Sequence, residues 1–321
     1  MVVVKEWKIK SQRRNLTIVV EFILLGFSDL PKLQGVLFGI FLIMYMSILL
    51  GNGLIIIITK TDPSLQTPMY FFLGNFSFSE ICYTSVTLPR MMMNLWTKKR
   101  NISFLNCALQ LGFLLILGGT ECLLLAVMAY DRYVAICKPL YYSLIMNSKV
   151  CTQLVLGSWF SAMPILIAQT YQIFSLPFCG SNILNHLFCD MPPLLKLACG
   201  KKFINEFFIY ADAVVFAMVP FLLILGSYIK IITTILEMPS ATGRYKAFST
   251  CSSHLIVVVL FFGSAIITYS IPKSSSLSGV DKVLSLFYTI VTPMFNPLIY
   301  SLRNKDVIAA LKKLLPKGLI S

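Results

Sequence analysis

Seven apolar stretches, each long enough to cross a lipid bilayer as a helix, constrain this chain more than any other feature. A helix needs about 20 mostly apolar residues to span the hydrocarbon core. The seven stretches reach this length, so the pattern predicts an all-α membrane protein, a seven-transmembrane helix bundle. The predicted spans are approximately 34–59, 69–95, 108–130, 150–170, 205–232, 248–271 and 283–302.

The composition agrees with a membrane protein and argues against other classes. Of the 321 residues, 57% are hydrophobic and only 12% are charged, whereas about 25% of the residues of a soluble domain are charged. The formal net charge of +14 is compatible with nucleic-acid binding. However, the basic residues lie in short segments between apolar runs and build no continuous basic face. We therefore expect contact with lipid headgroups and no nucleic-acid partner.

The segments outside the bundle divide the chain into three parts. We expect residues 1–33 to form an outer amino-terminal tail, residues 34–302 the seven-helix domain, and residues 303–321 an inner segment. Within the last part, apolar residues such as Val307 and Leu311 alternate at helical spacing with basic residues such as Lys312 and Lys313. This pattern predicts a short amphipathic helix on the inner leaflet.

The cysteines, and not the basic residues, indicate how the chain is oriented in the membrane. The lysines and arginines are nearly balanced between the two sides, so they do not decide the orientation. Cys107, Cys179, Cys189 and Cys199 all fall on one side, and disulfides persist in an oxidising compartment. That side is therefore outside, and the glycosylation sequon at Asn15 agrees. Four cysteines allow three pairings, among which the residues alone do not choose.

A charged pair, Asp131-Arg132, follows the third apolar stretch, where the span meets water on the inner side. Such a pair is either a headgroup anchor or part of a switch. Adjacent opposite charges flanked by Tyr130 and Tyr133 favour a latch that responds to the polarity of its surroundings.

The segment around this pair, Met128 to Cys137, resembles the odorant receptors, a branch of the rhodopsin-like G-protein-coupled receptors. Four further motifs match the same family in the same order, so that the resemblance covers nearly the whole chain. They are Gly51-Asn52, Pro68 to Leu73, Lys246 to His254 and Pro293 to Tyr300. The resemblance implies a multi-pass plasma-membrane receptor with an extracellular amino terminus, a small hydrophobic volatile ligand, and a heterotrimeric G protein of the stimulatory olfactory type that raises cyclic AMP.

The resemblance also implies which residues couple and which cysteines pair. The implied disulfides are Cys107–Cys189, which would tie the long outer loop to the third helix, and Cys179–Cys199, which would close that loop on itself. We expect the coupling and switch residues at the inner helix ends, with Tyr228 and His254 reaching toward Arg132 in one of two states. These residues are Asp131, Arg132, Tyr133, Tyr228, Arg244, Lys246, His254, Asn296, Pro297 and Tyr300.

Two carboxylates, Glu80 and Glu121, fall in the middle of apolar helices. A charge there costs at least a few kcal/mol, so both must face the bundle and be protonated, paired or bound to an ion. Two carboxylates in one interior favour a shared proton or a sodium ion between them. The resemblance places both beside Asn52 and Asn296. We expect no cofactor other than this structural sodium ion.

Counting helical turns outward from the inner motifs identifies the side chains at the depth where a ligand would bind. These side chains predict an apolar ligand pocket with few polar groups. Asp212 either faces this cavity or satisfies a donor on a neighbouring helix. The sequence Phe261-Phe262-Gly263 departs from the Phe-Tyr-Gly frequent in the family, so a hydroxyl is missing there. The predicted lining is Leu111, Leu114, Leu115, Gly118, Gly119, Ile209, Asp212, Ala213, Phe216, Phe262, Ala265, Ile266, Tyr269 and Thr289.

Two other functions compete with a receptor. A transporter or channel would use Glu80, Glu121 and Asp212 as an ion path, but the sequence has no inverted repeat and no paired broken helices. An intramembrane enzyme would need a nucleophile and a base at suitable spacing, and the sequence offers none. The sequence therefore favours a receptor and no enzymatic activity.

Overall fold

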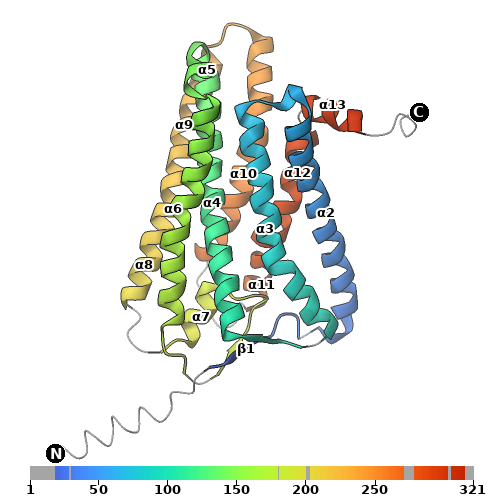
Figure 1. The fold of residues 1–321 in the computed structure, drawn as a ribbon, viewed down its shortest axis with the longest axis vertical. Helices are drawn as coiled ribbons and strands as arrows, with labels where there is room; N and C mark the ends of the chain where they lie inside the picture. Colours follow the sequence, from blue (N-terminus) through green and yellow to red (C-terminus); the bar gives the residue numbers. More distant parts are fainter. Residues whose placement is uncertain are drawn as a thin grey trace, which may run out of the picture.

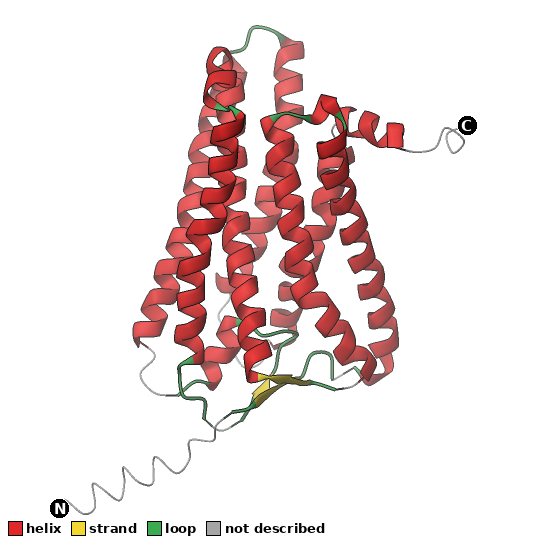
Figure 2. Cartoon of the chain, in the orientation of Figure 1, coloured by secondary structure: helices red, strands yellow, loops and turns green. Residues whose placement is uncertain are grey.

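Seven long helical rods run from one end of the molecule to the other, with a small sheet at one end (Figures 1 and 2). The computed structural model describes residues 19–314, apart from residues 29, 98, 180, 200–202, 271–277 and 303–304. The rods are α2 (Gln34–Thr61), α3 (Pro68–Thr97), α4 (Phe104–Cys137), α6 (Ser148–Phe174), α8 (Phe203–Ala213) continued through η4 (Val214–Met218) into α9 (Val219–Glu237), α10 (Ala241–Ser270), and α11 (Ser278–Leu286) continued through η5 (Phe287–Val291) into α12 (Thr292–Leu302).

Six of the rods in the described part of the chain are long and apolar enough to cross a membrane. The seventh, α3, has 30 residues but a lower mean apolarity, because it carries many polar side chains that face the bundle, such as Ser79, Glu80 and Thr84. α3 packs between α2 and α4. The predicted seven-helix bundle is confirmed.

The helices extend further into the inner aqueous side than predicted. α4 continues to Cys137 instead of residue 130, and α10 begins at Ala241 instead of residue 248. Hydropathy marks only the part of a helix that lies in lipid, whereas the backbone hydrogen bonds of a helix can continue into water. Polar caps set several ends: Ser103 accepts from the Asn106 amide before α4, and Asn147 accepts from the Val150 amide before α6.

The outer end is closed by a three-stranded sheet in the order β2-β1-β3. β1 (Glu21–Leu24) pairs antiparallel with β2 (Asn101–Ser103) and parallel with β3 (Ile183–Leu184) of the long loop. The expected tail of residues 1–33 is therefore not a free tail over its described part. A cluster of aromatic rings secures this strand, because Phe22 contacts Phe104, Phe174 and Phe178.

The predicted amphipathic helix is α13 (Lys305–Leu314), at the end of the molecule opposite β1 (Figure 1). Val307 and Ala310 are buried against the bundle, while Lys312 and Lys313 are exposed. Lys313 Nζ lies 2.8 Å from Asp62 Oδ2 in the turn after α2. Hydrogen bonds from Lys313 and Ser64 lower the pKa of the Asp62 carboxyl to about 2, so Asp62 stays ionised throughout the physiological pH range.

Candidate functional site

The inner end of α4 carries a closed polar latch. Both Nε and Nη2 of Arg132 donate to Asp131 Oδ2, and the Nε distance is 3.0 Å. The Tyr142 hydroxyl, on the short helix α5 (Tyr142–Ile145), donates to Asp131 Oδ1 at 2.8 Å. Asp131 is fully buried. A headgroup anchor would extend its charge to the surface, so the buried geometry favours the latch over the anchor.

Tyr142 was not predicted, because nothing in the sequence marks a loop tyrosine eleven residues after Asp131 as its partner. Burial and the neighbouring Asp131 carboxylate raise the pKa of the Tyr142 hydroxyl, so it remains a donor at physiological pH. Tyr133 is half-buried beside Tyr130, with its ring centroid 5.9 Å from Lys138 Nζ. The latch therefore joins α4 to the loop that follows it.

A second polar contact joins α9 and α10 at the same end. The Tyr228 hydroxyl lies 2.8 Å from His254 Nδ1 and 3.2 Å from the Cys251 carbonyl oxygen, to which it donates. Tyr228, His254 and Tyr300 are buried, and Arg132 lies within electrostatic reach of all three. In this structure Tyr228 and His254 contact each other, while Arg132 binds Asp131.

The other predicted coupling residues are distributed around these contacts. Arg244 is half-buried near the start of α10. Pro297 lies inside α12, where its Cβ approaches the backbone of α2 so closely that a Cβ at Gly51 would meet it at 3.0 Å. The side chain of Lys246, like the whole of Asn15, lies outside the described residues.

Of the contacts expected in the polar centre, the structure shows the one between Asn296 and Glu80. Asn296 Nδ2 donates to Glu80 Oε1, and Asn52 Nδ2 donates to the carbonyl oxygens of Ile48 and Pro293 at 3.1 and 3.4 Å. Glu121 interacts electrostatically with Glu80. Asn52, Glu80, Glu121 and Asn296 each retain one buried oxygen that has no hydrogen-bond partner among the described residues.

Unpaired buried oxygens of this kind are what the hypothesis of a bound cation or a shared proton requires. Carboxylate, amide and hydroxyl oxygens are the ligands that hard cations prefer, and the hydroxyls of Ser77 and Thr120 are likewise buried and unpaired in the described part of the chain. The described residues contain no group of three or more His, Cys, Asp or Glu side chains able to hold a metal ion. A cation here would therefore need amide and hydroxyl oxygens as well as the two carboxylates.

The predicted pocket residues have differing environments. Leu111, Leu114, Phe262 and Thr289 are buried, whereas Leu115, Gly118, Ile209 and Ala265 are half-buried. Ala213 and Ile266 are exposed on their helices, and the side chain of Tyr269 lies outside the described residues. Asp212 is half-buried, and no partner of its side chain is found among the described residues.

Gly119 is a packing position within this set. A Cβ at Gly119 would meet Leu166 Cδ1 of α6 at 2.8 Å and the ring of Phe216 at 3.5 Å. Phe216 and Leu166 form a small buried cluster with Ala162. The structure therefore brings Gly119 and Phe216 together. The lack of a side chain at Gly119 allows α4 to approach α6 closely.

Two disulfides hold the long loop over this region. They join Cys107 to Cys189 and Cys179 to Cys199, which is the pairing that the resemblance implied. Gln110 was not predicted, yet its Nε2 donates to the Val86 carbonyl oxygen and its Oε1 accepts from the Cys189 amide, both at 2.9 Å. Val86 lies one turn before Pro89, within α3. Gln110 thus fixes the loop to α3 and α4 beside the first disulfide.

Comparison with known proteins agrees with this architecture. A profile of the olfactory receptor family matches residues 41–317. Human olfactory receptor 10AG1 is 62% identical over 297 residues, which cover 92% of this chain and 99% of that receptor. Human olfactory receptor 10A4 is 53% identical over 306 residues, which cover 95% and 97% of the two chains. The match confirms the predicted class, a multi-pass plasma-membrane receptor and not an enzyme, and the chain belongs to the olfactory receptor family.

Proposed function

We propose that this receptor binds a small, hydrophobic, volatile odorant from the outer side and activates a heterotrimeric G protein of the stimulatory olfactory type, which raises cyclic AMP. The observation that carries the proposal is the closed latch of Asp131, Arg132 and Tyr142 at the inner helix ends. Buried ion pairs of this kind are poor sources of net stability. A role in holding one of two states explains why the chain contains one.

The mechanism is a population shift. A ligand stabilises the state that it binds better, by an amount equal to its differential affinity for the two states. In the closed state Arg132 binds Asp131, and Tyr228 binds His254. In the open state the inner ends of α9 and α10 move, Arg132 leaves Asp131, and the exposed groove accepts the G protein. The π-helical turns η4 and η5, before Pro220 and Pro297, suit helices that bend.

A ligand panel tests this function directly. Cells expressing the full chain are exposed to alcohols, esters, aldehydes and alkanes, and cyclic AMP is measured. A dose-dependent rise for at least one class is expected, together with its loss in cells that lack the stimulatory α subunit. A response that persists without that subunit, or that appears only as calcium release through another G protein, would contradict the coupling.

The polar centre around Glu80 and Glu121 is proposed to hold a sodium ion. The unpaired oxygens of Glu80, Glu121, Asn52 and Asn296 would bind it, and the ion would neutralise the buried carboxylates in the closed state. We expect sodium, compared with choline at equal chloride, to raise the melting temperature of the purified receptor by about 2–4 °C. Glu121→Gln should lose this shift. If the wild type shows no sodium dependence and is instead stabilised at acid pH, the two carboxylates share a proton.

Asp212 is proposed to bias the receptor toward ligands that donate hydrogen bonds. It lies two turns outward of Pro220, and it is half-buried. Asp212→Asn should weaken alcohols and amines about tenfold, because a hydrogen bond to a charged group contributes about 1.5–3 kcal/mol. Esters of the same length should change little. Dose-response curves for matched ligands measure this difference, and equal shifts for every class would assign Asp212 to helix packing.

A further inference from the structure

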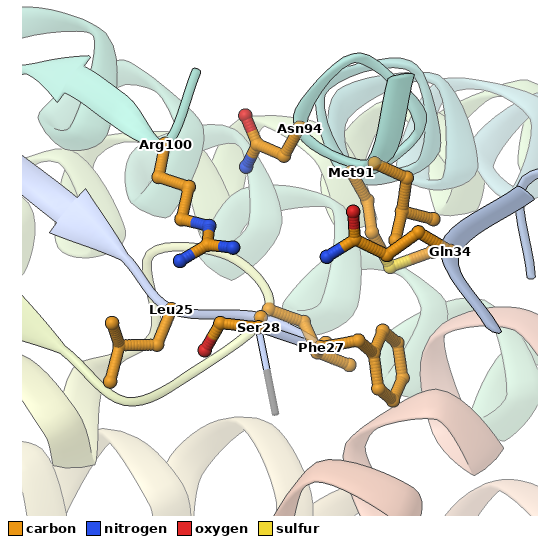
Figure 3. A pocket seen from close by; sticks show the side chains of 10 residues that line it. Leu25, Phe27, Ser28, Gln34, Met91, Asn94 and Arg100 are labelled. Carbon is orange, nitrogen blue, oxygen red and sulfur yellow. The ribbon is translucent and has the colours of Figure 1, made fainter. Parts of the chain in front are cut away.

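A small cavity lies at the outer end of the bundle, apart from the polar centre and the latch (Figure 3). It is enclosed by the outer ends of α2 and α3, the chain that follows β1, and Leu187 of the long loop. Its volume is about 20 Å³, which is enough for one particle of the size of a water molecule. Three of its lining side chains are Gln34, Asn94 and Arg100.

Arg100 brings a positive charge to this cavity, and it has no counter-charge among the residues that the structure describes. Its guanidinium is half-buried, and it makes no hydrogen bond or ion pair with any residue that the structure describes. The backbone of Arg100 is held in place, because its carbonyl oxygen accepts from the Leu24 amide at 2.9 Å. The neighbouring Arg90 differs, since it donates to the Asn101 carbonyl. A guanidinium remains protonated at every physiological pH, so this charge needs a counter-ion or water.

The two amide side chains add donors to the same space. In Figure 3 the amide nitrogens of Gln34 and Asn94 are the amide atoms nearer to Arg100, and the Asn94 oxygen points away from Arg100. That oxygen is buried and has no hydrogen-bond partner among the described residues. Gln34 is only 8% exposed, and its side chain makes no hydrogen bond with the described residues. A buried water needs acceptors as well as donors. Three converging donor groups, one of them charged, suit an anion better than a water molecule.

We propose that this cavity binds one small monovalent anion, of which chloride is the physiological example. The anion would accept from Arg100, Gln34 and Asn94, and it would thereby link the chain after β1 to the outer ends of α2 and α3. The exposed side chain of Lys32 adds to the positive potential at this rim. The volume excludes larger anions such as gluconate.

The test measures the melting temperature of the purified full-length receptor in lipid nanodiscs, in sodium chloride and in sodium gluconate at equal sodium concentration and ionic strength. We expect chloride to raise the melting temperature by about 3 °C, and bromide to do the same. Arg100→Gln should lose the shift. Lys99→Gln removes an equal charge from an exposed neighbouring position outside the cavity, and it should keep the shift.

Two outcomes would overturn the proposal: equal melting temperatures of the wild type in the two salts, or an undiminished chloride shift in Arg100→Gln. If that variant does not fold, Gln34→Glu provides the decision, because it places a carboxylate beside Arg100. This variant should be as stable in gluconate as in chloride. A full chloride shift in Gln34→Glu would place the anion elsewhere and reject the site.

Discussion

Arg132→Ala is expected to abolish ligand-stimulated cyclic AMP while the receptor still reaches the cell surface. In the closed state Arg132 is held by Asp131, and it interacts electrostatically with Tyr228 and His254. In the proposed mechanism Arg132 changes partners on activation, so its removal takes away the group on which the switch depends. We expect the maximal response to fall below about a tenth of the wild-type response, because the loss of a buried charge that partners a second buried charge has a large effect.

The measurement compares cyclic AMP with surface expression in the same cells. Lys149→Ala is the matched control, because Lys149 is also a basic residue on the inner side but is exposed at the start of α6. The control should signal normally. Full signalling by Arg132→Ala at normal surface expression would contradict the role of the latch. Loss of signalling in both variants would indicate a general effect of positive charge on the inner side of the membrane.

Loss of the Cys107–Cys189 disulfide is expected to reduce surface expression strongly. This disulfide closes a loop with a sequence separation of 82 residues, for which the chain-entropy relation gives about 4–5 kcal/mol. Cys179–Cys199 closes only 20 residues, for which the same relation gives about 3 kcal/mol. Both Cys107 and Cys189 are fully buried, so their replacement also disturbs the packing of the long loop against α4.

Cys107→Ser and Cys189→Ser should lower surface expression equally, and the double variant should be no worse than either, because the two residues act as one unit. Cys179→Ser is the comparison and should have the smaller effect. Surface labelling of the four variants measures this. Additive losses for Cys107 and Cys189 would indicate that they do not pair with each other.

The polar network shows which contacts the local sequence patterns predict and which they do not. The apolar runs and the carboxylates within them predicted that Glu80 and Glu121 face the bundle, because a buried charge excludes contact with lipid. The resemblance placed Asn296 beside Glu80, but the apolar runs did not predict that Asn296 donates to Glu80 across 216 positions of sequence, or that Gln110 ties α3 to the long loop. These contacts depend on the rotation and the separation of neighbouring helices, and these quantities are set by packing.

By itself, the sequence determined the number of membrane spans, the inner position of Asp131 and Arg132, and the outer side of the four paired cysteines. Each of these follows from a local property: apolar length, charge next to an apolar run, or redox compartment. Only the tertiary structure decided that α4 continues to Cys137 and that β1 joins the outer sheet. It also decided that Tyr142 closes the latch and that Arg100 has no counter-charge among the described residues. These features arise from contacts between distant segments, which hydropathy and spacing do not encode.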